Sequence, residues 1–242
     1  LASALSMDKL KAKELFRLHN VPTPPYYSIT TSDLDNIDAV HGYFGYPAVV
    51  KPCGESGGTG ITKVCEASEL SRAISHAFEY DDMAIVERFV PGTEINVGIL
   101  DGRVLGAVEI ASKNGIGDND RIYKQNDDCV ASSRLSPARY RGVLNLALRA
   151  AQSVGAAGAC LVDVIVTAGE NEYVLEVNTM PSLTPSSLLS KIASAAGYGF
   201  GDLCEALLDG ARLNQPLRRR PPVRAQSGAS REQERVRLLK VG

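Results

Sequence analysis

Apolar residues return every three or four positions in several parts of the chain, which is typical of helices that bury one face. The first such helix is predicted over residues 7–18, with Ser6 as its N-cap and the sequence VPTPP at 21–25 ending it. Its apolar face would contain Met7, Leu10, Leu15 and Leu18. Further helices are predicted over residues 68–78, with Ser68 as the cap, over 143–154, and, as shorter helices, over 186–195 and 201–208.

Runs of apolar and β-branched residues between these helices predict strands. They cover residues 47–52, 61–64, 83–86, 94–100, 103–110, 159–166 and 172–177. Asp101-Gly102 favours a hairpin with a type I′ turn, because both central residues of that turn need positive φ. Hairpins are mixed with helices, which indicates an α+β fold with mainly antiparallel sheets. Residues 111–137 show no periodicity and are interpreted as a long loop, functional or mobile.

Composition and charge narrow the class of protein. The chain has 242 residues, 44% hydrophobic and 22% charged, which is ordinary for a globular protein large enough for two subdomains around a cleft. No apolar run is long enough for a membrane helix. Eight Lys/Arg and two Glu lie between Arg218 and Lys240, whereas the whole chain has a net charge of −2. The body is therefore acidic, which argues against nucleic-acid binding, and residues 213–242 are predicted to be a flexible basic tail.

The cysteines and histidines predict no metal or disulfide chemistry. Cys53, Cys65, Cys129, Cys160 and Cys204 are widely spaced and form no C-x-x-C pair. This pattern is typical of reduced thiols in a cytoplasmic protein. The three histidines are isolated from one another, so each is interpreted as structural or exposed.

Polar oxygens interrupt two predicted strands that follow each other along the chain. Asp163 lies within the apolar run 159–166, where a bare carboxylate is costly unless it is paired or metal-bound. Glu176 and Asn178 are two residues apart on the next strand and therefore share a face. Hard oxygen ligands of this kind are what Mg²⁺ requires. The alternative is a polar stripe that faces solvent.

A second candidate site surrounds Lys51, which ends a predicted strand just before the glycine-rich loop GESGGTG at 54–60. Successive glycines let backbone N–H groups approach an anion, and a lysine adds a point charge for phosphate. The loop is not a Walker A motif and, taken alone, could be a plain turn. Glu87 and Glu94, seven residues apart, could accept hydrogen bonds from an adenine amine and from a ribose.

Taken together, these segments resemble the ATP-grasp ligases, in particular the D-alanine–D-alanine ligase family. The stretches that carry the resemblance are ASALSMDK (2–9), YPAVVKPCGESGGTGITKV (46–64), VERFVPGTEINVGIL (86–100), VDVIV (162–166) and YVLEVNTMPSLTPSSLL (173–189). The resemblance spans residues 1–212, and the N-terminal domain that the family carries before ASALSMDK is missing from this sequence. It implies the ATP-grasp fold: a subdomain at 1–90 with a lid loop at 54–60, and a subdomain at 91–212 with the metal site.

The resemblance also implies roles for the matched residues. ATP phosphates would be held by Lys9 and Lys51 and covered by a lid that includes Glu55, Ser56, Gly57 and Gly58. Glu87, Phe89 and Val90 would bind adenine, Glu94 the ribose, and Ser187 and Leu188 the carboxylate end of the second amino acid. Asp163, Glu176 and Asn178 would bind Mg²⁺ or Mn²⁺. The catalytic residues would be Lys9, Lys51, Tyr123, Lys124 and Ser182.

The implied reaction serves peptidoglycan precursor synthesis, and hence the cell wall. ATP phosphorylates the carboxylate of one D-alanine to an acyl phosphate. The amine of a second D-alanine then attacks, which yields D-alanyl-D-alanine, ADP and phosphate. The implied protein is a cytoplasmic homodimer with small-molecule substrates and with neither a nucleic-acid nor a membrane partner.

Besides the missing domain, three departures from the family pattern affect the acceptor half of the site. Leu161 stands where the family has an arginine, and Ser182 stands where it has a glycine. Gly57 and Gly58 replace serines, and Ile122 occupies the usual lysine position next to Tyr123 and Lys124. Two alternatives therefore stay open: a ligase of the same lineage that joins other substrates, and a nucleotide-binding homologue with weak or no ligase activity.

Overall fold

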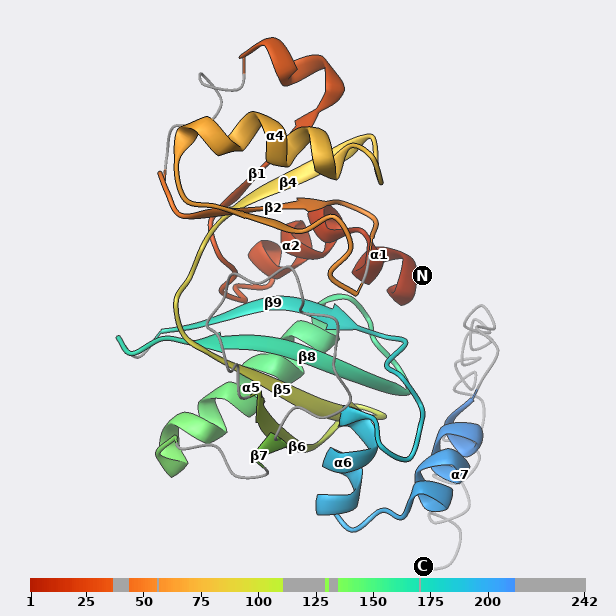
Figure 1. The fold of residues 1–242 in the computed structure, drawn as a ribbon. Helices are drawn as coiled ribbons and strands as arrows, with labels where there is room; N and C mark the ends of the chain where they lie inside the picture. The colour runs from red at the N-terminus through yellow and green to blue at the C-terminus, as the bar shows by residue number, and fades with distance from the viewer. Residues whose placement is uncertain (37–43, 56, 111–128, 131–134, 170, 212–242) are drawn as a thin grey trace, which may run out of the picture. The chain divides into compact units, whose positions relative to one another are not determined.

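The computed structural model describes residues 1–36, 44–55, 57–110, 129–130, 135–169 and 171–211 (Figure 1). Residues 1–211 form one compact unit, and residues 212–242, which include the predicted basic tail, lie outside the described residues. The compact unit contains two antiparallel sheets, each with its own helices. This arrangement confirms the expectation of an α+β fold.

The first sheet has four strands in the order β1-β4-β2-β3. Their bounds are Tyr26–Thr30 for β1, Met83–Arg88 for β4, Ala48–Pro52 for β2 and Thr62–Val64 for β3. Helix α4, Ala67–Ala77, covers one face with the buried residues Leu70, Ala73, Ile74 and Ala77, as their spacing predicts. Strand β1 and the 3-10 helix η1 at Thr31–Asn36 are additions that the pattern analysis missed.

The second sheet has five strands in the order β7-β6-β5-β8-β9. Their bounds are Cys129–Val130 for β7, Arg103–Ile110 for β6, Thr93–Leu100 for β5, Ala159–Val166 for β8 and Glu172–Asn178 for β9. The β5–β6 turn confirms the type I′ prediction, because Asp101 and Gly102 have φ of 46° and 73°. The interpretation of 111–137 as one loop is wrong at two places, since residues 129–130 pair with β6 and Pro137 begins α5.

Helices cover both faces of the second sheet (Figure 1). Helix α5, Pro137–Ser153, packs against β8 and β9 and buries the apolar face predicted for it. On the other face, α6 at Leu188–Ala195 contacts β5 and β6, and α7 at Phe200–Gly210 contacts α6. A second apolar cluster forms there and includes Leu161, Leu189, Ile192 and Leu203.

The predicted first helix is two helices, α1 at Ala2–Met7 and α2 at Lys9–Leu18. Asp8 separates them in an extended conformation and accepts a hydrogen bond from the Lys11 backbone N–H, so it is the N-cap that was expected at Ser6. The predicted apolar face is wrong for Met7 and Leu18, which are 44% and 74% exposed, whereas Leu15 packs against the core. The buried face consists of Lys9, Ala12, Lys13 and Phe16.

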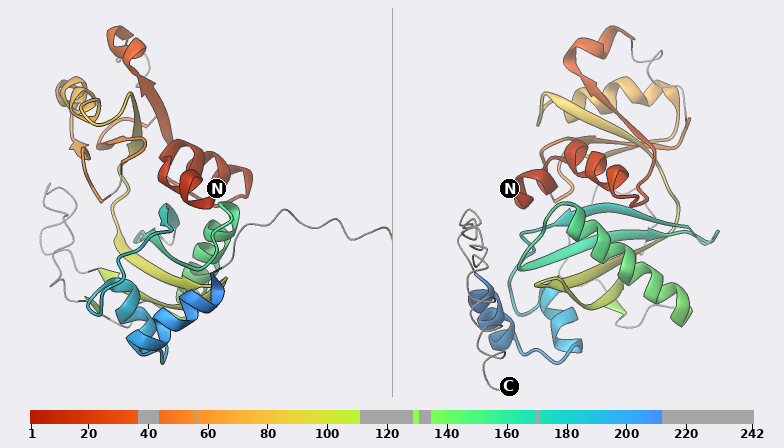
Figure 2. Two further views of the ribbon diagram at one scale, coloured as in Figure 1. Left: turned by 90° about the vertical axis from the view of Figure 1, so that its right-hand side faces the viewer. Right: turned by 180° about the vertical axis from the view of Figure 1, so that it is seen from behind.

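Helices α1 and α2 lie against β9, and α2 also contacts α5, as both views of Figure 2 show. Ala12 and Phe16 belong to the same buried cluster as Ile95 and Val164 of the second sheet. The core of the second sheet therefore includes residues from the very start of the chain. The division at residue 90 stays a prediction.

Several smaller expectations concern caps, thiols and membranes. The N-cap of α4 is Glu66, and Ser68, the predicted cap, lies inside the helix. Cys53, Cys65, Cys160 and Cys204 are free thiols, in agreement with the prediction. Within the described part of the chain, no helix is long and apolar enough to cross a membrane.

Candidate active site

Two lysines from different elements lie near the glycine-rich loop, and one of them contacts it directly. Lys9 begins α2; its backbone N–H donates to the carbonyl of Cys53 at 2.9 Å, and its ammonium donates to the carbonyl of Glu55. Lys51 comes from β2 and forms an ion pair with Glu87 of β4. The structure thus brings Lys9 and Lys51 to one region, as the predicted phosphate site requires.

Glu87 is at the centre of a buried charge cluster. One carboxylate oxygen pairs with Lys51, and the other lies 2.7 Å from the ammonium of Lys13. Burial alone would raise the pKa of Glu87, but the charges of Lys13 and Lys51 outweigh it and lower the pKa to about 2. Glu87 is therefore an anion at neutral pH, held on both sides by ammonium groups.

On the second sheet, Asp163 of β8 lies directly opposite Glu176 of β9. Asp163 is 6% exposed, and burial raises its pKa well above the ordinary range, reinforced by the carboxylates of Glu176 and Glu94. Like charges brought together in a buried place are stable only when a proton or a cation sits between them. This pair of carboxylates fits a divalent cation.

Two amides complete the polar face around this carboxylate pair. Asn178 lies two residues beyond Glu176 on the same face, and its Oδ1 accepts a hydrogen bond from the Met180 N–H at 2.9 Å. Asn96 of β5 lies opposite Asp163 on the other side; it is fully buried, and its amide atoms find no hydrogen-bond partner among the described residues. The donor set is thus two carboxylates flanked by amides, and the described residues contain no cluster of three His, Cys, Asp or Glu side chains suited to a metal.

The lysines and the carboxylates act on one another electrostatically. Burial lowers the pKa of Lys9, and the Glu176 carboxylate opposes that shift. Burial raises the pKa of Asp163, and the Lys51 ammonium opposes it. Because each interaction joins a residue of one group to a residue of the other, the predicted phosphate and metal sites form a single polar region.

The glycine-rich loop begins and ends in close contacts. The Gly54 N–H donates to Asp81 at 2.6 Å, and a Cβ at Gly60, where φ is +69°, would lie 2.6 Å from Pro52. Gly57 and Gly58 also have positive φ, which glycine adopts without strain. Ser56 lies outside the described residues, so the predicted lid is described only in part.

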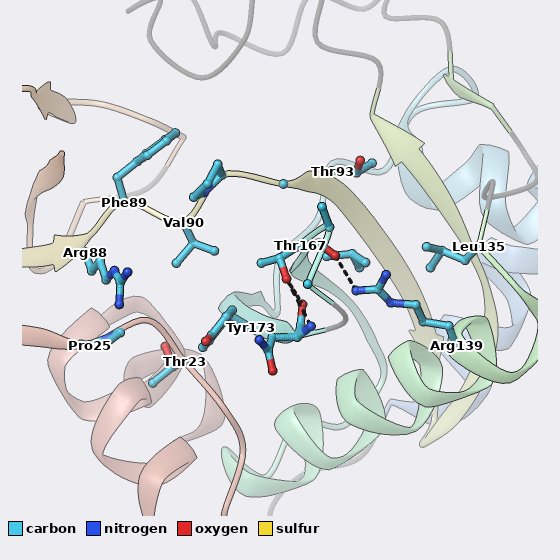
Figure 3. A pocket seen from close by; sticks show the side chains of 16 residues that line it. Thr23, Pro25, Arg88, Phe89, Val90, Thr93, Leu135, Arg139, Thr167 and Tyr173 are labelled. Carbon is cyan, nitrogen blue, oxygen red and sulfur yellow. Dashed lines mark hydrogen bonds between the residues drawn. The ribbon is translucent and has the colours of Figure 1, made fainter. Parts of the chain in front are cut away.

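The predicted adenine residues Phe89 and Val90 line a pocket of about 850 Å³ (Figure 3). Thr93, Thr167 and Tyr173 also line it, and Arg139 donates to the carbonyl of Thr167 at 2.6 Å. None of the lysines and carboxylates described above lines this pocket. It is therefore distinct from the polar region, and Glu94, which neighbours Thr93 on the strand, points to the opposite face of the sheet.

The structure describes some of the residues predicted for the acceptor half of the site and leaves others outside the described residues. Ser182 is exposed on the segment that follows β9. Ser187 is the N-cap of α6 and accepts a hydrogen bond from the Ser190 N–H at 3.3 Å, while Leu188 packs against the cluster of α6 and α7. Tyr123 and Lys124 lie outside the described residues, so their predicted roles stay predictions.

Sequence reasoning missed two buried polar residues of this region, Lys13 and Asn96. Lys13 follows Lys9 by one helical turn, so the i, i+4 spacing of two lysines was the available signal. Asn96 follows Glu94 by two residues on one strand face, as Asn178 follows Glu176. A search for apolar periodicity alone therefore misses both Lys13 and Asn96.

The comparisons with known proteins agree with this geometry. Residues 15–209 match the family model described as the D-ala D-ala ligase C-terminus. The D-alanine–D-alanine ligase of Anaeromyxobacter sp. (strain K) is 40% identical over 214 residues, which are 88% of this chain and 70% of that protein. The chain belongs to the D-alanine–D-alanine ligase family. The ligase of Geobacter sulfurreducens is likewise 40% identical, over 88% of this chain and 67% of that protein.

Solved structures of the D-alanine–D-alanine ligase family share the fold. The D-alanine–D-alanine ligase from Bacillus anthracis, complexed with ATP, superposes with a TM-score of 0.73 at 27% identity, over 87% of this chain and 67% of that chain. The VanG D-Ala:D-Ser ligase from Enterococcus faecalis gives a TM-score of 0.79 at 27% identity, over 86% of this chain and 62% of that chain. The ATP-grasp fold expected for this ligase-family chain is thereby confirmed, and ATP with a divalent metal is the general requirement of the family.

Proposed function

We propose that this chain is an ATP-dependent carboxylate–amine ligase that forms D-alanyl-D-alanine through an acyl phosphate. The observation that carries the proposal is the placement of Lys9 on the glycine-rich loop and of Asp163 opposite Glu176, with the charges of the lysines and the carboxylates acting on one another. Two ammonium groups facing two carboxylates suit a nucleotide phosphate chain bound together with a divalent cation. The ligases at 40% identity support the choice of D-alanine as substrate.

The proposal assigns the binding of phosphate to the lysines and the binding of metal to the second sheet. Lys9 and Lys51 hold the phosphates, and the loop from Gly54 to Gly60 covers them. Asp163, Glu176 and Asn178 hold Mg²⁺ or Mn²⁺, which neutralises phosphate charge when it is bound. Glu87, Phe89 and Val90 orient the adenine, and Glu94 orients the ribose. Catalysis then depends on positioning and charge neutralisation, as in other phosphoryl transfers.

The acceptor half of the site indicates that dipeptide formation by this chain is slow. Leu161 shares the face of Asp163, but it is 7% exposed and packed in the apolar cluster with Leu189 and Ile192. It offers no donor to the oxyanion that forms when the second amine attacks, and one such donor contributes a factor of about 10² to 10³ in rate. The same observation favours the second candidate function, a nucleotide-binding homologue with weak ligase activity.

The test is to incubate the chain with ATP, Mg²⁺ and D-alanine, and to measure phosphate release and D-alanyl-D-alanine by mass spectrometry. We expect both products to depend on D-alanine and to disappear in Glu176→Gln, which removes one carboxylate of the pair. Glu14→Gln, an exposed carboxylate on α2, serves as the matched control and leaves the rate unchanged.

The outcomes separate the alternatives. Phosphate release that depends on another amino acid identifies a ligase of the same lineage with other substrates. Nucleotide binding by calorimetry with little or no turnover identifies the weak homologue. A folded chain that binds no ATP in the presence of Mg²⁺ would contradict the nucleotide site itself.

The proposal also covers the cellular location and the oligomeric state of the protein. Free thiols and the use of ATP support a cytoplasmic location. A homodimer, as the family resemblance implies, is measured by light scattering, where a monomer mass would contradict it.

A further inference from the structure

Lys13 is one of the largest fully buried side chains of the protein. Its ammonium lies 2.7 Å from Glu87 Oε2 and donates to Thr23 Oγ1 at 2.7 Å. It also lies 5.4 Å from the centre of the Tyr26 ring, within range of a cation–π contact. Three contacts thus fix the ammonium in one place, inside the protein and beside Glu87.

The charges around Glu87 can be counted from these contacts. Lys13 and Lys51 bring two positive charges to one carboxylate, so the three residues carry a net charge of +1. With Lys13 removed, Glu87 and Lys51 would form a neutral pair. The partly exposed Lys51, whose side chain is 14% accessible, would then present no net charge to an anion.

A structural ion pair is the alternative explanation, and it makes a different prediction for the variants described below. A buried ion pair contributes little net stability, because the cost of desolvating both charges offsets most of their attraction. Removal of Lys13 alone is different, because it leaves the buried Glu87 carboxylate with one ammonium partner instead of two. Burial does lower the pKa of Lys13, and the charge of Glu87 opposes that shift.

We propose that Lys13 is a positioning residue for the nucleotide phosphates, which neutralises Glu87 and so leaves the charge of Lys51 available to them. The inference rests on the proposed nucleotide site and adds the residue that sets its charge. Lys13 acts through Glu87 and Lys51 and makes no contact with the nucleotide.

The test compares four full-length proteins: wild type, Lys13→Met, Glu87→Gln and the double variant. Calorimetry with Mg²⁺ gives the dissociation constants of ADP and of adenosine, and the ratio of the adenosine constant to the ADP constant isolates the contribution of the phosphates. The net charge of the cluster is +1 in the wild type, 0 in Lys13→Met, +2 in Glu87→Gln and again +1 in the double variant. Each unit is expected to change the ratio by about 10-fold, since one charge in a partly buried site contributes at least that much.

The expected order is therefore Glu87→Gln above the wild type, the double variant close to the wild type, and Lys13→Met lowest. Lys11→Met, an exposed lysine on the same helix, is the matched control and leaves the ratio unchanged. Lys13→Arg retains the charge and is expected to keep the ratio within about 3-fold. If Lys13→Met does not fold, the double variant still distinguishes the explanations, because the proposal predicts a ratio close to that of the wild type and a structural role predicts a ratio unlike it.

A failure of this inference can be distinguished from a failure of the proposed function. A double variant with a ratio far below that of the wild type, or a Lys13→Met ratio equal to it, overturns the inference and leaves the nucleotide site intact. A wild-type chain that binds no ADP overturns the proposed function, and this inference with it.

Discussion

Leu161 lies directly opposite Asn178 across strands β8 and β9, so an apolar side chain stands next to a predicted metal ligand. Leu161 is buried with Leu189, Ile192 and Leu203, in the cluster formed under α6 and α7. The cluster therefore extends to the edge of the polar region. At this position the side chain contributes to packing.

Leu161→Ala is expected to lower the free energy of unfolding by about 2–4 kcal/mol, the usual cost of a cavity at a buried leucine. Urea denaturation followed by circular dichroism measures it. Leu208→Ala is the control, because Leu208 is 74% exposed on α7 and its truncation leaves no cavity. Equal stability of the two variants would contradict the packing role of Leu161.

Mg²⁺ is expected to raise the melting temperature of the chain in the absence of nucleotide, and more so at pH 8 than at pH 5. The pKa of Asp163 is raised in the folded protein, so the stability it contributes is present at low pH and is lost as the pH rises through that pKa. A bound cation offsets the loss by pairing with the buried Asp163 carboxylate. Differential scanning fluorimetry with MgCl₂ and with EDTA measures the difference.

Asp163→Asn tests whether the Asp163 carboxylate is the origin of the response of the melting temperature to Mg²⁺. The variant removes the like charge beside Glu176, so it is expected to melt higher than the wild type in EDTA and to lose most of the response to Mg²⁺. Asp33→Asn, far along the chain on η1, is the control and keeps the response. A full Mg²⁺ response in Asp163→Asn would place the cation elsewhere.

Glu87 is expected to contribute to acid unfolding in a defined window. Its pKa falls from 4.5 to about 2 on folding, so the stability it contributes is present above pH 4.5 and is lost as the pH falls toward 2. Glu87→Gln should therefore be less stable than the wild type at pH 7, with a difference that narrows between pH 4.5 and 2. Urea denaturation at several pH values measures this, and a difference that is constant with pH would contradict it.

Cys53 is expected to resist alkylation, whereas Cys65 reacts. Burial raises the pKa of the Cys53 thiol to about 11, and its Sγ lies 3.4 Å from Asp8 Oδ1, to which it donates. Cys65 is exposed. Treatment with iodoacetamide at pH 7.5, followed by peptide mass spectrometry, should label Cys65 first. Equal labelling of both residues in the folded chain would contradict the buried thiol.

The elements that could be predicted from sequence are those whose pattern is set by their own residues. Strands β8 and β9 follow from their runs of apolar and β-branched residues, and the type I′ turn follows from Asp101-Gly102. Their pairing brings Asp163 opposite Glu176, as their positions on neighbouring strands predicted. Strand β1 was missed because it directly follows VPTPP, and its identity as a strand depends on pairing with β4.

The buried face of α2 could not be predicted from apolar spacing. Lys9 and Lys13 are buried because Glu87 and the carbonyl of Glu55, distant in sequence, receive their charges. Leucine at position 18 is exposed because the helix ends there, beyond the sheet-facing residues. The buried side of this helix is determined by tertiary contacts, and the apolar periodicity of the sequence carries no information about those contacts.

Helix α2 also limits how chimeras of this chain can be built. Ala12 and Phe16 fill the core of the second sheet, while one turn apart Lys9 and Lys13 reach the loop after β2 and Glu87 of β4. A join at residue 90 between two parent ligases would supply the helix from one parent and the cavity that receives it from the other. An exchange of segments therefore has to move the first helices together with the sheet at 93–178. The residue at position 87 then has to be chosen so that it can pair with the residue at position 13 of the transferred helix.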